Sequence, residues 1–474
     1  MTFAAGVASM SLPLAATEAV GWAVVRLFSD GLTRLEKAAW SFAGGLLTQC
    51  AIFLGYLLAG SAAGMGKILL VDALIVGTSL AFSRPRRVTV PCRGREGGAR
   101  AALVLLAVVA ASAWSLFLVQ ALSEPMWATD YLAIWGLKGK IIFQASALPR
   151  RLFTDPALFW AHREYPLLVP VSLALFAALV GAWSDQVLAL LWPACELATL
   201  LALAGFLGRR VSRFAGAGAA ALAALCFPLY QAVNVGTAEV PCALAFVLVG
   251  CALLDFLEGA STARLARLAA ASLFCVSIKQ EGSVFVLFSA ALLFVRLRRH
   301  PDRSWRGGVA ALLAPLVAHS GLLRILSGPQ ARRDFDFTLF LPHRWPELPA
   351  LFATVIGRLV GTEARLALIP LLAIAGYLLV TRRGIGDSLL PVFAAQIACY
   401  ALAFSLSAFG PIYAIDSAFR RLALTLFPAF ALVLGARIGP TGEAIPPADE
   451  RPMLRARQTS RPGRSDPHRN AAPR

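Results

Sequence analysis

AALVLLAVVAASAWSLFLVQA, residues 101–121, is a mostly apolar run without a charged residue, and runs of this kind recur along the chain. About 20 apolar residues are enough to cross the hydrocarbon core of a bilayer as a helix. Hydrophobic residues make up 58% of the 474 residues and charged residues only 15%. A water-soluble protein of this size could not keep so much apolar surface away from water. The predicted fold class is therefore all-α, a polytopic transmembrane helical bundle of about 12–14 spans.

The net charge of +18 is distributed in short segments between the apolar runs, such as RPRRVTVPCRGREGGAR (84–100) and RLRRHPDRSWR (296–306). Arginine-rich connections of this kind follow the positive-inside pattern, which orients a membrane protein and argues against nucleic-acid binding. The eight cysteines include no CxxC pair and lie mostly in apolar runs. They are interpreted as small buried hydrophobic residues, and neither a zinc site nor a disulfide framework is predicted.

The apolar runs and the charges between them predict an organisation in six regions. These are N-terminal transmembrane helices (1–121), a long outer loop with interfacial helices (122–163), a transmembrane core (164–327), a second outer loop (328–364), C-terminal transmembrane helices (365–438) and a disordered, basic cytoplasmic tail (439–474). The loop charges require residues 164–207 to cross the membrane an odd number of times. One of the apolar stretches 166–182 and 187–207 is therefore expected not to cross, and the sequence does not say which.

The outer loop begins with SEPMWATDYLAIWGLKGKIIF, residues 123–143, which combines tryptophans with four charged residues, namely Glu124, Asp130, Lys138 and Lys140. If this stretch is helical, Trp127, Tyr131 and Trp135 form one aromatic stripe. Aromatic stripes suit the headgroup layer, so a helix on the outer membrane surface is expected. Asp130 stands at the start of that helix. It is either the N-cap or a reactive carboxylate beside the bundle.

Four further stretches place charge at the ends of apolar segments: HREYPLLVP (162–170), NVGTAEVP (234–241), SIKQEG (277–282) and PIYAIDSAFRRLALTLFPAF (411–430). Lys279 and Glu281 interrupt an otherwise apolar stretch and predict two short helices on either side. Arginines at an outer helix end depart from the positive-inside trend, and an anionic ligand would explain that departure. Acids and cations on one outer face suit a general base that acts beside a lipid phosphate.

In this order, the five stretches resemble the C-superfamily of membrane glycosyltransferases, and most closely its family 39-type bacterial integral membrane proteins. The resemblance covers roughly Ser123 to Pro428. It implies a glycosyltransferase that moves a sugar from a polyprenyl-phosphate donor to an acceptor, with inversion, at the outer face of a bacterial inner membrane. It also implies that Asp130 is the general base of this reaction.

The resemblance further implies a set of substrate-binding residues: Glu124, Trp135, Lys138, His162, Glu164, Tyr165, Glu239, Lys279, Glu281, Arg420 and Arg421. Either Arg420 or Arg421 would match the family's late arginine near the donor phosphate. The chain departs from the family pattern where Thr129 precedes Asp130 in place of tryptophan, and where Glu164 and Glu239 replace aspartates. No residue spacing requires a metal, although the outer acids are able to hold a divalent cation through oxygen ligands. The sugar and the acceptor are not identified.

Two alternatives remain open at this point. A transporter or flippase of a lipid-linked or anionic solute would place charged residues near the midplane, along a route between the two sides. A non-catalytic member of the family would bind the lipid-linked sugar without transferring it, and the departures from the motif pattern motivate that alternative.

Overall fold

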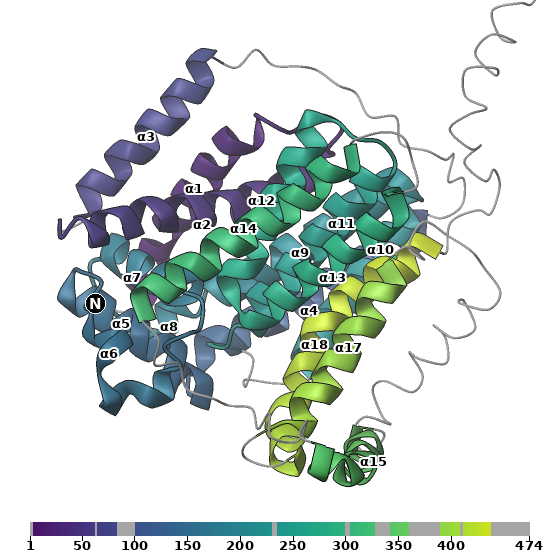
Figure 1. The fold of residues 1–474 in the computed structure, drawn as a ribbon. Helices are drawn as coiled ribbons and strands as arrows, with labels where there is room; N and C mark the ends of the chain where they lie inside the picture. Colours follow the sequence, from purple (N-terminus) through teal and green to yellow (C-terminus); the bar gives the residue numbers. More distant parts are fainter. Residues whose placement is uncertain are drawn as a thin grey trace, which may run out of the picture. The chain divides into compact units, whose positions relative to one another are not determined.

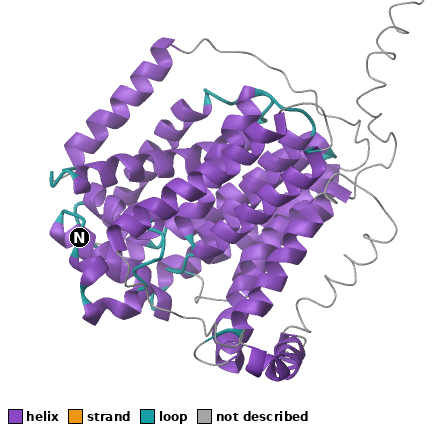
Figure 2. Ribbon diagram, viewed as in Figure 1, coloured by secondary structure: helices purple, strands orange, loops and turns teal. Residues whose placement is uncertain are grey.

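The computed structural model describes residues 3–61, 64–82, 100–229, 235–298, 304–327, 342–359, 389–407 and 411–437. The regular elements within these ranges are helices (Figure 2), which confirms the all-α fold class. The expected span 365–381 and the expected tail 439–474 lie outside the described residues.

Helices follow one another along the chain (Figure 1). Their bounds are α1 Phe3–Val25, α2 Arg34–Leu58, α3 Met65–Phe82, α4 Arg100–Ser123, α5 Gly136–Ala145, α6 Arg151–Thr154, α7 Leu168–Val180, α8 Asp185–Leu188, α9 Leu191–Arg210, α10 Arg213–Leu229, α11 Glu239–Leu257, α12 Thr262–Ile278, α13 Gln280–Leu297, α14 Ser304–Ser327, α15 Leu348–Leu359, α17 Leu390–Ser405 and α18 Pro411–Arg437. A π-helical turn, η1, covers Tyr131–Trp135, and 3-10 segments cover Pro156–Ala161 (η2) and Pro342–Glu347 (η5).

Among the described residues, six helical segments are long and apolar enough to cross a membrane: Gly6–Val25, Arg34–Leu58, Arg100–Ser123, Asp185–Arg210, Glu239–Leu257 and Trp305–Leu326. They differ sharply in how much protein surrounds them. In α11 the apolar window is 94% buried, whereas in α4 it is 11% buried and in α14 only 6%. Helices that expose apolar side chains all along their length are expected in a bilayer and not in water. The chain is therefore a membrane protein.

Helix α11 forms the centre of the described bundle, because it packs against α9, α12, α13 and α18. Its side chains are apolar and buried along almost the whole length. Only its two ends carry buried acids, Glu239 in the first turn and Asp255 in the last. At the rise of an α-helix these two residues lie about 24 Å apart.

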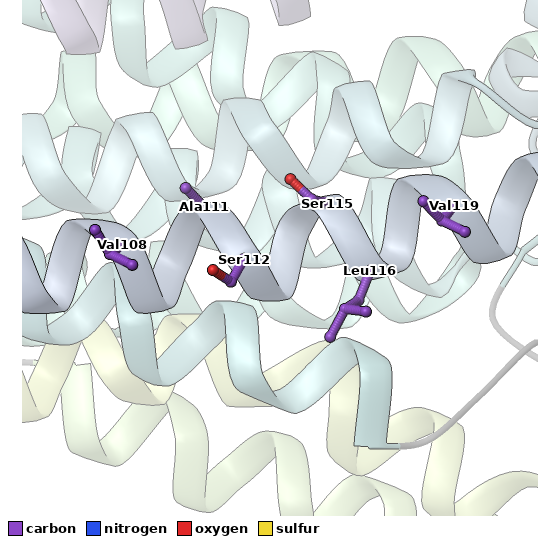
Figure 3. A pocket seen from close by; sticks show the side chains of 6 residues that line it. All are labelled: Val108, Ala111, Ser112, Ser115, Leu116 and Val119. Carbon is purple, nitrogen blue, oxygen red and sulfur yellow. The ribbon is translucent and has the colours of Figure 1, made fainter.

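Helix α4 leads directly into the outer loop and turns apolar side chains away from the protein. Small side chains between larger ones leave a shallow hollow on its outer face, which six residues of this one helix line (Figure 3): Val108, Ala111, Ser112, Ser115, Leu116 and Val119. The hollow contains no charged group and is separate from the charged residues described below.

The prediction of an aromatic stripe in the headgroup layer was wrong. Tyr131 and Trp135 are buried, with 3% and 0% of their surfaces exposed, and only Trp127 is exposed, at 53%. The stripe assumed regular α-helical spacing, but the chain makes a π turn here, with one extra residue per turn. The two buried rings therefore face the bundle and anchor the loop to it.

The length of the helices decides which half of 164–207 is able to cross the membrane. Helix α7 has 13 residues, or about 20 Å, which is shorter than a hydrocarbon core of about 30 Å. The segment Asp185–Arg210 has 26 residues with a mean hydropathy of 2.0. The second stretch, 187–207, is therefore the one with the dimensions of a membrane span.

The two short helices expected around SIKQEG are confirmed as α12 and α13. Lys279 alone separates them, in extended conformation with φ −154° and ψ 156°. Gly282 then allows the two helices to meet, because a Cβ atom at this position would lie 2.1 Å from the carbonyl oxygen of Cys275. The turn places Lys279 beside the first residue of α11.

Candidate functional site

Five charged residues meet at the end of α11 where that helix begins. Asp130 directly precedes the π turn, Glu239 is the first residue of α11, and Arg421 lies on α18. Lys279 occupies the extended link between α12 and α13, and Glu281 follows in the first turn of α13. We call these five residues the outer charge cluster, because this end of α11 is expected to be the extracytoplasmic one.

Acids and bases alternate along the outer charge cluster. Arg421 forms an ion pair with the Asp130 carboxylate, and its Nη1 also lies 3.7 Å from Glu239 Oε1. Lys279 Nζ lies 3.0 Å from the same Glu239 oxygen and 2.9 Å from Glu281 Oε1. Glu239 is therefore shared by two cations, and each cation is shared by two acids. The formal charges of the five side chains sum to −1.

Glu239 is the most deeply buried member, with only 2% of its side chain exposed, and Lys279 follows at 8%. A buried carboxylate is tolerated only when cations or hydrogen bonds compensate its charge. Asp130 and Arg421 are more open, at 24% and 18%. The cluster therefore has a buried, fixed half around Glu239 and a more accessible half around Asp130.

Asp130 is not the N-cap of the helix that follows it. Its side chain makes no capping hydrogen bond, and its backbone has helical angles of φ −64° and ψ −33°, whereas a capping residue lies outside the helical region. The carboxylate points instead to Arg421 on α18. The structure thus decides between the two sequence interpretations of this residue in favour of a tertiary contact.

A second group of predicted residues packs around Lys138, whose side chain is fully buried. Lys138 Nζ donates a hydrogen bond to the His162 carbonyl oxygen at 2.6 Å, and His162 Nδ1 lies 3.3 Å from Glu164 Oε1. The Tyr165 ring stacks on His162 at 4.4 Å and on Trp135 at 5.5 Å between centroids. These five residues fasten the HREYP segment to the start of the outer loop.

Burial gives Lys138 unusual protonation chemistry. Loss of hydration lowers the pKa of the Lys138 ammonium to about 7, and the nearby Glu164 carboxylate opposes only part of that shift. Tyr165, which stacks on His162, is also an electrostatic neighbour of Lys279. The Lys138 group therefore lies near the outer charge cluster.

Some predicted residues are not brought into this region. Glu124 is exposed, and it accepts a hydrogen bond from the Trp127 indole nitrogen at 3.4 Å. Of the two candidate arginines, Arg421 contacts Asp130, while the side chain of Arg420 lies outside the described residues.

Sequence reasoning missed Asp185, which accepts hydrogen bonds from both Tyr131 and Trp183. It lies in the short polar link between the apolar stretches 166–182 and 187–207, where an acid resembles an ordinary solvated turn residue. No local signal distinguishes it, because its partner Tyr131 is distant in sequence.

Sequence reasoning also missed a second buried ionic cluster at the opposite end of α11. Arg209 binds Glu36 at 2.6 Å and Asp255 at 3.2 Å. Arg210 pairs with the same Asp255, and Arg267 lies 3.6 Å from it. These contacts tie α2, α9, α11 and α12 together. An acid inside the apolar run of α11 was a usable signal, because ionisable residues within spans are rare and partnered.

Two acids are buried within the helices between the ends of the bundle. Glu196 on α9 is fully buried, and neither carboxylate oxygen has a hydrogen-bond partner among the residues that the structure describes. Asp72 on α3 accepts a hydrogen bond from Gln49 at 2.6 Å, and Gln49 in turn accepts one from Thr17 at 2.5 Å. These groups lie outside the outer charge cluster and require an explanation in any account of function.

The outer charge cluster contains three carboxylates, yet within the described ranges no group of three or more His, Cys, Asp or Glu residues is arranged to hold a metal ion. In Asp130 and Glu239 the carboxylate oxygens face the cations of Arg421 and Lys279. The chemistry that this arrangement supports directly is charge-assisted binding of an anion next to a carboxylate base.

Comparison with known proteins identifies no relative: no family model, no curated protein and no solved structure matches this chain.

Proposed function

We propose that the protein is a membrane glycosyltransferase that transfers a sugar from a polyprenyl-phosphate donor to an acceptor at the outer face of a bacterial inner membrane. The observation that carries the proposal is the position of Arg421, which binds the Asp130 carboxylate while it also reaches Glu239. A cation between a partly exposed acid and a buried acid suits an anionic oxygen that arrives from the lipid side. The sequence resemblance described above supports the same chemistry.

In the proposed reaction, the donor phosphate competes with Asp130 for the guanidinium of Arg421. Glu239 remains compensated by Lys279 at 3.0 Å when Arg421 turns away from it. Asp130 then loses its cation, and its carboxylate is free to accept a proton as a general base. In the resting protein, the base is thus masked by the residue that binds the donor.

The transfer step balances as a single displacement. Asp130 takes the proton from the acceptor hydroxyl, and the acceptor oxygen forms a bond to the anomeric carbon. The bond from that carbon to the phosphate oxygen breaks, and the electron pair leaves with the lipid phosphate. Arg421 and Lys279 stabilise the charge on the departing phosphate, a type of electrostatic stabilisation that is commonly the largest contribution to catalysis. The configuration of the sugar is inverted.

The test compares envelope glycans of cells that lack the protein with those of cells that express either the wild type or Asp130→Asn. The asparagine keeps the size of the side chain but cannot accept the acceptor's proton, so the glycan formed by the wild type is expected to be lost. Asp155→Asn is the matched control, because Asp155 lies in the same loop and its carboxylate accepts a hydrogen bond from the backbone N–H of Ala157. An undiminished glycan in Asp130→Asn cells, at equal protein levels, would remove Asp130 from the reaction.

A transporter or flippase is the second candidate, and Glu196 is the observation that favours it. This acid lies within a span and has unbonded oxygens, which is a feature of proton and solute routes through membranes. The two candidates make opposite predictions for Glu196→Gln. A transporter that uses this acid loses its activity, whereas the proposed transferase keeps normal glycan formation in Glu196→Gln and loses it in Asp130→Asn.

A further inference from the structure

We propose that Asp185 and Tyr131 are positioning residues that hold Asp130 in place for the reaction proposed above. The effect on catalysis rests on the proposed function. The contacts themselves join segments that are far apart in the sequence. Neither residue belongs to the outer charge cluster. Both act through the backbone that carries the cluster.

Asp185 fixes Tyr131 from the far side of the loop. The Tyr131 hydroxyl donates to Asp185 Oδ1 at 2.5 Å, and the Trp183 indole nitrogen donates to the same oxygen at 2.8 Å. Burial and the Asp185 carboxylate both raise the pKa of the Tyr131 hydroxyl, so this group remains a donor throughout the physiological range. Because both donors use Oδ1, the site requires one oxygen acceptor and not a full carboxylate.

Two glycines enclose the Tyr131 ring. A Cβ atom on Gly136 would lie 2.5 Å from the ring carbon that bears the hydroxyl, and one on Gly236 would lie 2.9 Å from Tyr131 Cβ. Gly236 also has φ +93°, a conformation that L residues rarely adopt. The ring is therefore held at its hydroxyl, at its edge and at its base. A residue held at three points cannot rotate without moving the backbone of Asp130, its neighbour in sequence.

The same contact connects Asp130 and Glu239, two of the three acids of the cluster. Gly236 is followed by Thr237, whose carbonyl oxygen accepts a hydrogen bond from the Trp192 indole nitrogen at 2.6 Å. That segment ends at Glu239, the first residue of α11. Tyr131 thus packs against the segment that carries Glu239 while it adjoins Asp130. The distance between the masked base and the buried acid depends on this one ring.

The first experiment uses four variants of the full chain in cells: Tyr131→Phe, Asp185→Ala, Asp185→Asn and the control Asp155→Ala. Tyr131→Phe and Asp185→Ala each remove one side of the hydrogen bond and are expected to lower glycan formation on the order of 10- to 100-fold, since displacements of about 1 Å cost that much. Asp185→Asn keeps an oxygen acceptor and is expected to stay within about twofold of wild type, as is Asp155→Ala.

A second measurement separates positioning from general damage. Farnesyl phosphate serves as a soluble probe of the donor's lipid phosphate, and its affinity for the purified chain in nanodiscs is measured. Arg421 and Lys279 are intact in every variant, so the affinity is expected to stay within about twofold of wild type. A variant that loses affinity and glycan formation together, or an Asp185→Asn as defective as Asp185→Ala, would overturn the positioning role.

Amide hydrogen exchange tests the positioning role independently of the proposed function. The backbone amides of 130–136 and 235–240 are expected to exchange faster in Tyr131→Phe and Asp185→Ala than in wild type, while α9 is unchanged. Unaltered exchange in both segments contradicts the inference, whatever the glycans show. Asp130→Asn could leave the glycans unchanged while the two segments exchange faster in Tyr131→Phe and Asp185→Ala. That result would contradict the transferase proposal and still support the positioning of Asp130 by Tyr131 and Asp185.

Discussion

At the scale of single residues, the outer charge cluster is organised around a shared acid. Lys279 and Arg421 both form ion pairs with the same oxygen of Glu239, Oε1. Such an arrangement affects the free energy of unfolding most when a single member is removed. Replacing a whole buried ion pair by apolar groups is often harmless, but removing one partner leaves a buried charge without compensation.

Lys279→Met is therefore expected to destabilise the protein by about 3–5 kcal/mol, because it leaves the buried Glu239 carboxylate with only the more distant Arg421. Adding Glu239→Leu to that variant should recover a large part of the loss. The measurement is the free energy of unfolding in mixed detergent micelles. Lys140→Met is the matched control, since Lys140 is exposed, and an equal loss in that variant would contradict the explanation.

Lys138 predicts a pH dependence whose sign follows from its burial. Its pKa is about 7 in the folded protein and about 10.4 in an unfolded chain. Between these values the unfolded state binds the extra proton, so the free energy of unfolding rises with pH from about 7 towards 10 and is lower below pH 7. Lys138→Met should remove this rise in a pH series of unfolding measurements, while Lys140→Met retains it. A rise that persists in Lys138→Met would assign it to another group.

At the scale of elements, the site is assembled from helix ends and links, with Arg421 added from within α18. The π turn, the first turn of α11, the link between α12 and α13, and α18 each contribute one or two charged residues. Helix ends are suited to this task because their polar groups reach the cluster while the apolar middle of each helix packs in the bundle. Close contacts between the connecting segments then set the distances within the site.

Gly236 supplies the sharpest test of such a contact. Gly236→Ala places an alanine at a backbone position with positive φ and brings its Cβ atom into a clash with Tyr131. Gly181→Ala also places an alanine at a positive φ, +81°, but nothing lies within 4 Å of the new Cβ atom. Gly181→Ala should cost about 1–2 kcal/mol of folding free energy from the backbone alone. Gly236→Ala should cost more than that and should also lower glycan formation. Equal unfolding free energies for the two variants would show that the contact with Tyr131 is unimportant.

At the scale of the whole molecule, the two buried ionic clusters lie at opposite ends of α11. The outer charge cluster lies at one end, and the Arg209 cluster with Glu36 and Asp255 lies at the other. The apolar length between them, about 24 Å along the helix, approaches the thickness of a hydrocarbon core. We therefore expect the two clusters to lie near the two interfaces of one membrane.

Single-cysteine labelling tests this arrangement in cells. Ser184→Cys lies beside Asp185 and should react with a membrane-impermeant maleimide added to intact cells. Ala260→Cys follows α11 at its other end and should react only after permeabilisation, because the arginine-rich side is expected to face the cytoplasm. The signal is compared with that of the unsubstituted chain, because Cys399 is partly exposed, while the cysteines at 50, 195, 242, 251 and 275 are buried. Labelling of both positions from the same side would contradict the assigned topology.

Part of the candidate site could be predicted from the sequence, and the physical reason differs from residue to residue. Lys279 and Glu281 were detectable because charged side chains within a long apolar stretch must have partners. Asp130 was detectable only as one of two alternatives, since an aspartate before a helix satisfies the rules for a cap as well. Asp185 was not detectable, because an acid in a polar link has no local feature that predicts a buried partner.

The sequence by itself determined the all-α class, the membrane environment and the break at Lys279, because hydrophobic length and interrupting charges act locally along the chain. The tertiary structure alone decided that Asp130 pairs with Arg421, that Tyr131 and Trp135 face inward, and that Asp185 holds Tyr131. Each of these facts depends on contacts between segments far apart in sequence. Such contacts are set by how side chains of many helices pack together, and no single segment contains that information.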